Sequence, residues 1–167
     1  MEGFSLRQAR PEERIELTRL CVRATRHLGY DDAFIERIMP QLTVALRSIV
    51  EGNVQVCDSD VRSVIGVVWI DSPIVERVMS TRVRAIATLG GIFVEPSAWR
   101  RGIGRLLFGA AVTRAREREA DALMIHAEPS AEGFYQRLGA IRIGEGPFHS
   151  ASEVMLPQLL FPVPRQD

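Results

Sequence analysis

The stretch at residues 93–111, FVEPSAWRRGIGRLLFGAA, carries residue types that suit an anion site. An apolar, strand-like segment ends at a proline, and a helical pattern begins a few residues later. The main-chain amides at the start of a helix lack acceptors within the helix, and they lie at the positive end of its dipole. Gly102 and Gly104 let a ligand approach those amides closely, because no Cβ stands in the way. The pattern predicts a phosphate-binding turn over residues 99–105.

Three arginines in this turn support the same prediction. Arg100, Arg101 and Arg105 place positive charge at the helix end where the dipole is already positive, which costs stability unless an anion lies there. The planar guanidinium group also matches the geometry of phosphate oxygens. We therefore expect these side chains to hold a ligand that carries phosphate.

Other phosphate-binding motifs do not fit these residues. A dinucleotide fingerprint needs a third glycine where Leu107 stands. A nucleoside-triphosphate loop needs a lysine, and all 21 basic residues of the chain are arginine. A glycine-containing turn with solvated arginines is the alternative that remains.

Composition narrows the class of protein. A chain of 167 residues with 46% hydrophobic and 25% charged residues predicts one soluble α/β domain over 1–167. The formal net charge is zero, which gives no reason to expect nucleic acid or a membrane as partner. Cys21 and Cys57 are too few for a disulfide framework or a zinc site, so no metal is expected. With no apolar leader and no long apolar run, a cytoplasmic location is predicted.

Hydrophobic periodicity predicts the elements that position the turn. Alternation indicates strands at 4–9, 53–59, 61–71, 83–95, 122–128, 140–145 and 153–161. Helical spacing indicates helices at 11–27, from Asp31 or Asp32 through Ile38, from Ile103 through Ala115 and at 130–139, with a short helical turn within 40–52. Residues 72–82 are expected to form a polar connection. The predicted order is βααββ–βαβαββ, an α/β (α+β) arrangement.

Two further stretches carry recognisable motifs. IFVEPSAWRRGIGRLL resembles motif A of the GCN5-related N-acetyltransferases, in which a strand ending V-x-P runs into [QR]-x-x-G-x-[GA]. SAEGFYQRLGA (130–140) resembles motif B of the same superfamily, and RHLGYDDAFIERIMPQLTV (26–44) resembles a segment of one bacterial branch. The chain is identified as a member of this superfamily, in its small single-domain bacterial branch. That implies a mixed, mostly antiparallel sheet of about seven strands flanked by about four helices.

The motifs depart from the family pattern at a few positions. Trp99 stands where the family prefers Gln or Arg, although its backbone N–H remains available. Ala140 replaces an aromatic residue. Ser130 lies near the position where many members have an asparagine that contacts the cofactor.

The resemblance implies transfer of an acetyl group from acetyl-CoA, as co-substrate, to a primary amine by direct attack. The pantetheine arm would pair with the main chain of Ile92, Phe93 and Val94, in the manner of strand addition. A backbone N–H there would stabilise the developing oxyanion. The remaining cofactor contacts would come from Trp99, Arg100, Arg101, Gly102, Ile103, Gly104, Arg105, Ser130 and Phe134.

Tyr135 is the expected general acid. A phenol has a reference pKa of about 10, above the roughly 8.5 of a thiol, so it is protonated near neutral pH. It can therefore donate a proton to the departing thiolate. The alternative is that Tyr135 only packs beside Phe134.

The general base stays open at this stage. The candidates are His27, Glu95, His126 and Glu128, while a water relay or an amine that is already neutral needs no base. His27 and Tyr30 lie in the connection that normally walls the acceptor site of the family. The pair Gly90 and Gly91 marks a bulge or a close approach to the strand, and it is a further candidate for substrate contact.

The acceptor is expected to be a small-molecule or peptide amine. A non-catalytic acyl-CoA-binding or regulatory module with the same fold is the alternative function. Residues 153–161, rich in Leu and Phe, would be hazardous as a bare edge strand, so a homodimer is also expected.

Overall fold

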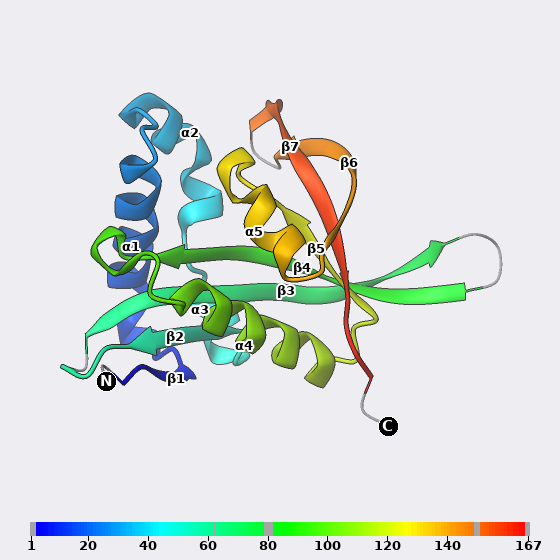
Figure 1. Ribbon diagram of the computed structural model, residues 1–167, viewed down its shortest axis with the longest axis horizontal. Coiled ribbons are helices and arrows are strands. Elements are labelled where there is room, and N and C mark those ends of the chain that lie inside the picture. Colours follow the sequence, from blue (N-terminus) through cyan, green and yellow to red (C-terminus); the bar gives the residue numbers. More distant parts are fainter. Residues whose placement is uncertain (1–2, 62, 79–81, 149–150, 166–167) are drawn as a thin grey trace. The chain divides into compact units, whose positions relative to one another are not determined.

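The computed structural model describes residues 3–61, 63–78, 82–148 and 151–165, and Figure 1 shows the order of their elements. The strands lie in one sheet in the order β1-β2-β3-β4-β5-β7-β6. Their bounds are β1 (Ser5–Gln8), β2 (Val54–Asp58), β3 (Val64–Val78), β4 (Arg82–Val94), β5 (Ala122–His126), β6 (Ile141–Phe148) and β7 (Ala151–Pro162). The helices are α1 (Arg14–His27), α2 (Asp32–Leu42), α3 (Leu46–Val50), α4 (Ile103–Glu117) and α5 (Glu132–Arg137), with 3-10 turns η1 (Pro11–Glu13), η3 (Pro96–Ala98) and η4 (Pro129–Ala131).

The sheet is mixed and mostly antiparallel, as predicted. β2 runs antiparallel to β1 and β3, and β7 runs antiparallel to β5 and β6. β4 and β5 are parallel, with Ile86 opposite Ala122 and Thr88 opposite Met124. A parallel pair needs a long crossover connection, and α4 lies within it.

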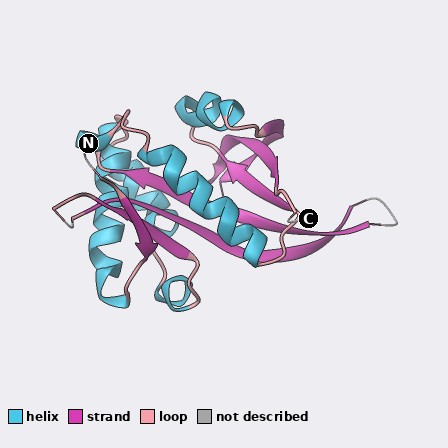
Figure 2. Cartoon of the chain, turned by 60° about the horizontal axis from the view of Figure 1, so that its bottom comes forward, coloured by secondary structure: helices cyan, strands magenta, loops and turns pink. Residues whose placement is uncertain are grey.

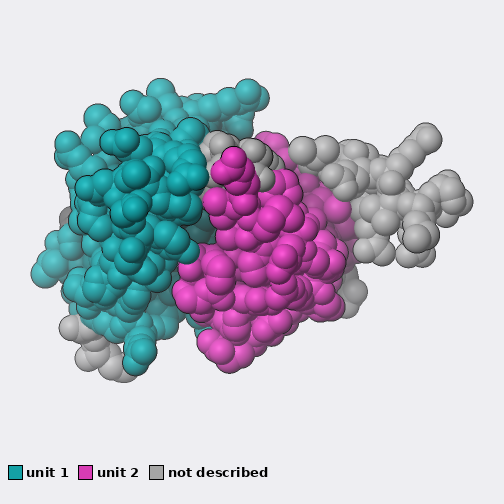
Figure 3. Space-filling view, turned by 90° about the horizontal axis from the view of Figure 1, so that it is seen from above, with its two compact units in different colours: residues 1–69, 90–111 teal, residues 70–89, 112–167 magenta. Residues whose placement is uncertain are grey.

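The chain divides into two compact units, which Figure 3 colours separately. Unit 1 consists of Met1–Trp69 and Gly90–Ala111, and unit 2 of Ile70–Leu89 and Val112–Asp167.

Unit 1 contains a core built from helix α1 and strands β2 and β3. Its fully buried side chains include Leu17, Leu20, Val54, Val56 and Val67. Each such side chain contributes about 1.5–3 kcal/mol by leaving water.

Helix α4 lies across the strands of the sheet in Figure 2, and its start packs on β3 at Gly66. A Cβ at Gly66 would lie 2.8 Å from Leu107 Cδ1 and 3.1 Å from Ile103 Cγ2. The glycine therefore allows the helix to lie close to the strand, which fixes where the turn before α4 begins.

Unit 2 is organised around β5 and the β6–β7 hairpin, drawn in orange to red in Figure 1. Ile125 of β5 lies opposite Leu159 of β7, and both are fully buried. Asp121 anchors the start of β5: its N–H donates to Ala85 O at 2.7 Å, and its carboxylate accepts from Ala85 N at 3.1 Å.

Two predictions about the sheet are wrong. Residues 72–78 continue β3 rather than forming a connection, while 79–81 lie outside the described residues. The register with β2 ends at Val54 opposite Trp69, so Pro73 interrupts no hydrogen bond to that neighbour. Residues 153–161 are also not an edge strand, because β7 lies between β5 and β6. The argument for a homodimer from that strand therefore fails.

Candidate active site

The turn between β4 and α4 has a backbone that favours an anion. Arg100 has a φ of 62° and Gly102 a φ of 84°, both in the left-handed region. A Cβ at Gly102 would meet no atom within 4 Å, so glycine stands there for its conformation and not for packing. Left-handed residues in a turn orient successive N–H groups toward one side, which is the arrangement that binds phosphate in such turns.

The first turn of α4 follows directly. The hydrogen-bonding pattern of the helix begins with Leu106, whose N–H donates to Gly102 O at 3.2 Å. An α-helix provides no acceptors for its first amides, here those of Ile103, Gly104 and Arg105. Ile103 is fully buried and anchors the turn, whereas Arg105 is exposed. Because Ile103 is packed in the core of unit 1, the position of these amides is fixed.

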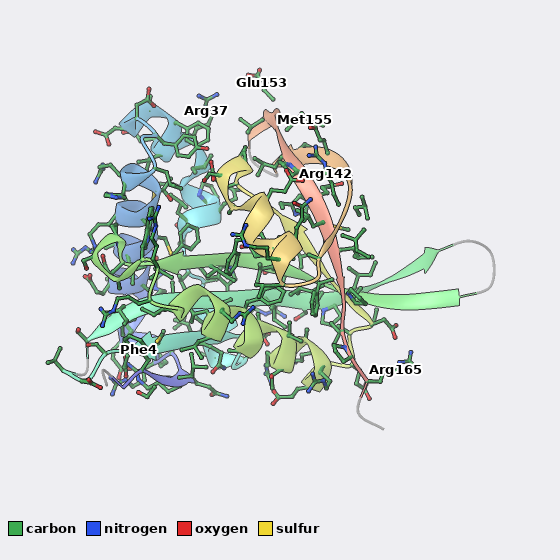
Figure 4. The ribbon with its side chains drawn as sticks, in the orientation of Figure 1. Phe4, Arg37, Arg142, Glu153, Met155 and Arg165 are labelled. Carbon is green, nitrogen blue, oxygen red and sulfur yellow. The ribbon has the colours of Figure 1, made fainter. Side chains whose placement is uncertain are left out.

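The three arginines of the turn have different surroundings. Arg101 places its Cζ over the ring of Phe4, 5.0 Å from the centroid. Phe4 lies near the N-terminus and is labelled in Figure 4. The face of an aromatic ring attracts a cation, so a contact of this kind helps to hold the guanidinium in place. Arg100 and Arg105 are exposed. No pattern in the sequence indicates that Phe4 contacts Arg101.

Trp99 connects the turn to two other elements of unit 1. Its indole Nε1 donates to Val94 O at 2.8 Å, and its ring meets the ring of His27 edge-on, with the centroids 4.9 Å apart. Sequence reasoning expects only the backbone N–H of Trp99 to serve. That N–H donates to Pro96 O at 3.3 Å, and the side chain supplies a connection that the motif does not indicate.

His27 and Tyr30, the predicted acceptor contacts, both have aromatic neighbours. His27 ends α1 against Trp99, and Tyr30 stacks on Phe34 with ring centroids 4.6 Å apart. Arg37 lies over the Phe34 ring of that pair, 5.7 Å from its centroid. Each of the two predicted acceptor contacts therefore lies in its own aromatic pair, on either side of the α1–α2 connection.

Strand β4 ends in the segment predicted to pair with the pantetheine arm. Ile92, Phe93 and Val94 are all half-buried. Phe93 stacks on Trp69 of β3, with centroids 5.7 Å apart and planes 18° apart. Packing within unit 1 explains why residues 90 and 91 are glycines: Trp69 lies against Gly90, and the Phe93 ring lies against Gly91.

Tyr135, the predicted general acid, lies on α5 in unit 2. It is buried, and burial raises the pKa of its phenol above the ordinary value of 10. Phe134 meets it edge-on at 5.0 Å between centroids. Ser130, which begins the same region, is bonded through both its N–H and its hydroxyl to the Glu128 carboxylate.

The four candidates for a general base are all engaged in contacts. Glu95 forms an ion pair with Arg23 of α1, and Glu128 accepts from Ser130. His126 Nε2 lies 3.0 Å from the side-chain amide of Gln158, which favours a structural role for this histidine. His27 packs on Trp99.

Neither metal-binding clusters nor membrane-spanning helices are found among the described residues. They contain no group of three or more His, Cys, Asp or Glu side chains that could hold a metal ion. Among the same residues, no helix is both long and apolar enough to span a membrane.

A mixed sheet in this strand order, with a glycine-containing turn between β4 and α4, defines the GNAT fold class. The family model described as Acetyltransferase (GNAT) domain matches residues 65–151, just over half of the sequence, and the chain belongs to this family. None of the curated proteins matches the sequence.

Solved structures agree on the fold. A GNAT acetyltransferase from Staphylococcus aureus Mu50 superposes with a TM-score of 0.70 at 13% identity, over 97% of this chain and 100% of that one. A GNAT family acetyltransferase from Brucella melitensis, in complex with acetyl-CoA, gives 0.64 at 17% identity, over 100% and 95%. A GCN5-related N-acetyltransferase from Kribbella flavida gives 0.65 at 18% identity over 86% of this chain, which spans only 34% of that longer one.

Proposed function

We propose that this protein is an N-acetyltransferase that moves an acetyl group from acetyl-CoA to a primary amine by direct attack. The observation that carries the proposal is the turn after β4, where positive φ at Arg100 and Gly102 precedes the first amides of α4, which have no acceptors within the helix. Coenzyme A has a diphosphate, and this backbone suits a diphosphate. Family membership supports the acetyl group as the cargo.

The proposed reaction assigns one step to each of these groups. The amine nitrogen forms a bond to the thioester carbonyl carbon, and a backbone N–H of Ile92 or Val94 stabilises the negative charge that develops on the carbonyl oxygen. The carbon–sulfur bond then breaks, and the nitrogen loses its extra proton to water. Tyr135, protonated at neutral pH, supplies the proton that the departing thiolate takes up.

The acceptor is a small-molecule or peptide amine, and the protein acts in the cytoplasm. Ser130 and Phe134 are further proposed coenzyme contacts. His27 and Tyr30 are the proposed acceptor contacts, while the rings of Trp69 and Phe93 cover the faces of Gly90 and Gly91.

The binding half of the proposal is tested by thermal shift and calorimetry with acetyl-CoA. Gly102→Ala forces a side chain into a left-handed conformation, which costs about 1 kcal/mol and disturbs the amides of the turn. We expect its affinity for coenzyme A to fall at least about fivefold. Gly109→Ala, in the middle of α4 with no atom within 4 Å of the added Cβ, is the matched control and should bind normally.

The chemical half is tested by release of free thiol over a panel of amines. Amine-dependent release of coenzyme A supports the proposal. Binding of acetyl-CoA without release for any amine would assign the protein to acyl-CoA sensing instead. Absence of any thermal shift with acetyl-CoA would remove both assignments.

A further inference from the structure

The side chain of Trp99, in unit 1, has no role in the reaction proposed above. The residue is 38% exposed, although two contacts hold its ring in place. The indole Nε1 donates to Val94 O at 2.8 Å, and the ring edge meets His27. An exposed tryptophan held at both ends is a fixed part of the surface.

The direction of the Val94 carbonyl follows from the pairing of its neighbour. Glu95 N donates to Ile65 O of β3 at 2.8 Å. In an extended strand the main-chain groups of one residue point to one edge and those of the next residue point to the other. The groups of Val94 and Ile92 therefore point to the edge of β4 opposite β3, and those of Phe93 and the N–H of Glu95 point toward β3. Only the former edge is available for strand addition by a ligand.

Trp99 lies at the end of that available edge. Its indole N–H takes up an acceptor position on Val94 O, where a ligand amide would otherwise continue the ladder. The residues immediately after Trp99 include those with positive φ. One side chain thus joins the last carbonyl on this edge of β4 to the start of the phosphate turn.

Helix α1 holds the same region from its other side. Arg23 forms an ion pair with Glu95, and His27 contacts Trp99. Arg23 and His27 are four residues apart, so they lie on one face of α1. The end of β4 and the turn are both fixed to that face.

We propose that Trp99 is a positioning residue for the acyl carrier, with its indole N–H closing the available edge of β4 at Val94 and fixing the phosphate turn to the strand. The carrier arm then pairs with Ile92 and with the N–H of Val94, while the diphosphate begins at residue 100. This inference rests on the proposed function. It adds Trp99 to the residues that position the coenzyme, and it names Val94 as the point on β4 where strand-like pairing with the ligand stops.

The test uses two variants that separate the ring from the donor. Trp99→Phe keeps an aromatic ring for His27 and removes the N–H. Trp99→Gln keeps an N–H donor and removes the ring. Coenzyme A binding is measured by calorimetry, and kcat and KM for acetyl-CoA are measured by thiol release. His27→Ala removes the ring contact and leaves the indole bond, so it measures the effect of the ring contact alone, and Gly109→Ala, with open space around the added Cβ, is the matched control.

We expect Trp99→Phe to raise the Kd for coenzyme A and the KM for acetyl-CoA about threefold to tenfold, with kcat within about twofold of the parent. Trp99→Gln should bind coenzyme A more tightly than Trp99→Phe, and His27→Ala should bind it more tightly still. Unchanged Kd in Trp99→Phe would overturn the proposal. So would a purely structural result, in which the melting temperature falls and kcat falls as much as KM rises.

A second measurement uses the unaltered protein, in case the variants fold poorly. The Trp99 indole resonance is followed by NMR during a titration with coenzyme A. A bond to Val94 O predicts an indole N–H that exchanges slowly with solvent and shifts on binding, whereas exchange as fast as in a free indole would overturn the proposal. If the parent protein binds no coenzyme A, the proposed function fails, and the indole exchange still reports whether the bond exists.

Discussion

The indole of Trp69 occupies the space that a side chain at Gly90 would fill. A Cβ built on Gly90 would lie 1.9 Å from Trp69 Nε1 and 2.2 Å from Cδ1. Trp69 is only 7% exposed and stacks on Phe93, so its ring has little room to move away. Gly90 therefore serves as the surface on which a buried aromatic ring rests.

This relationship predicts that Gly90→Ala destabilises the protein. The added methyl group must displace a packed ring, and overpacking of this kind costs about 1–3 kcal/mol. Urea unfolding should show that loss in the free energy of unfolding. Gly109→Ala adds the same methyl group inside α4 with open space around it, and it should gain about 0.5–1 kcal/mol. Equal stability of the two variants would contradict the packing argument.

The pair Gly90 and Gly91 also shows how much of the structure can be predicted from the sequence. A glycine pair within a strand indicates that something approaches the backbone closely, and this is correct for residues 90–91. What approaches Gly90 is Trp69, 21 positions earlier in the numbering of the sequence. Periodicity predicts which element a residue joins, but it does not predict which side chain of another strand lies against it.

The same limit explains the errors in the sheet. The strand periods over 122–128, 140–145 and 153–161 correspond to β5, β6 and β7. Their order in space does not follow from their order in the chain, and β7 lies inside the sheet rather than at its edge. Residues 72–78 look polar and contain Pro73, yet they extend β3, because strand pairing there depends on neighbours that the local pattern does not reveal.

In the candidate site, the local motif is the more informative part. One continuous stretch predicts the strand, turn and helix around residues 92–105, and they form as expected. The contacts of Phe4 with Arg101 and of Arg23 with Glu95 join residues far apart in the sequence, and no motif indicates them. Arg142 of β6, labelled in Figure 4, likewise pairs with Glu132 of α5 and with Glu145, and these contacts are seen only in three dimensions.

A pH-dependent part of the stability is predicted at Glu13. Hydrogen bonds from the Arg7 guanidinium, at 2.7 and 2.9 Å, hold the pKa of the Glu13 carboxyl at about 2, against an ordinary value of 4.5. Because the folded-state pKa is the lower one, this stabilisation is fully present above pH 4.5 and is lost as the pH falls toward 2. With solvent screening, we expect about 1 kcal/mol from it.

The measurement compares the free energy of unfolding at pH 7 and pH 3. Glu13→Gln keeps the shape of the side chain and removes its charge, so the parent should lose more stability on acidification than the variant does. Glu12→Gln changes a neighbouring carboxylate whose side chain is 71% exposed, and it should respond to acid like the parent. If Glu13→Gln and the parent respond equally to pH, the Arg7 contact has no effect on stability.

Tyr135→Phe is predicted to separate turnover from binding. The buried phenol has a raised pKa and keeps its proton through neutral pH, so the parent should show no loss of activity from its ionisation near pH 8. A general acid contributes about 100-fold or more to the rate, and the variant should lose kcat on that scale with its Kd for coenzyme A unchanged. Phe134→Leu alters the ring against Tyr135 and leaves the hydroxyl, so it tests packing through kcat alone, because Phe134 is itself a proposed coenzyme contact. A parallel loss of kcat and of affinity in Tyr135→Phe would assign the residue to packing.

The last prediction concerns the acyl donor and the protein itself. All 21 basic residues are arginine, so the chain has no lysine amine for acetyl-CoA to modify. Cys21 and Cys57 are buried, and desolvation raises the pKa of both thiols, so neither presents a reactive thiolate to the donor. Prolonged incubation with acetyl-CoA should therefore leave every side chain unmodified, with acetylation confined to the N-terminal amine.

Peptide mapping by mass spectrometry checks this prediction, and one substitution provides its control. Arg47→Lys introduces an amine at a position whose side chain is 88% exposed, on α3, away in the sequence from the turn that follows β4. The new amine should become acetylated under the same conditions, which shows that the donor is active and that the method detects a single site. Acetyl groups on a cysteine or an arginine of the parent chain would show that burial and guanidinium chemistry do not protect it. Their absence, together with a modified peptide spanning position 47 in the variant, would show that an all-arginine surface lets the protein handle an acylating agent without being acylated.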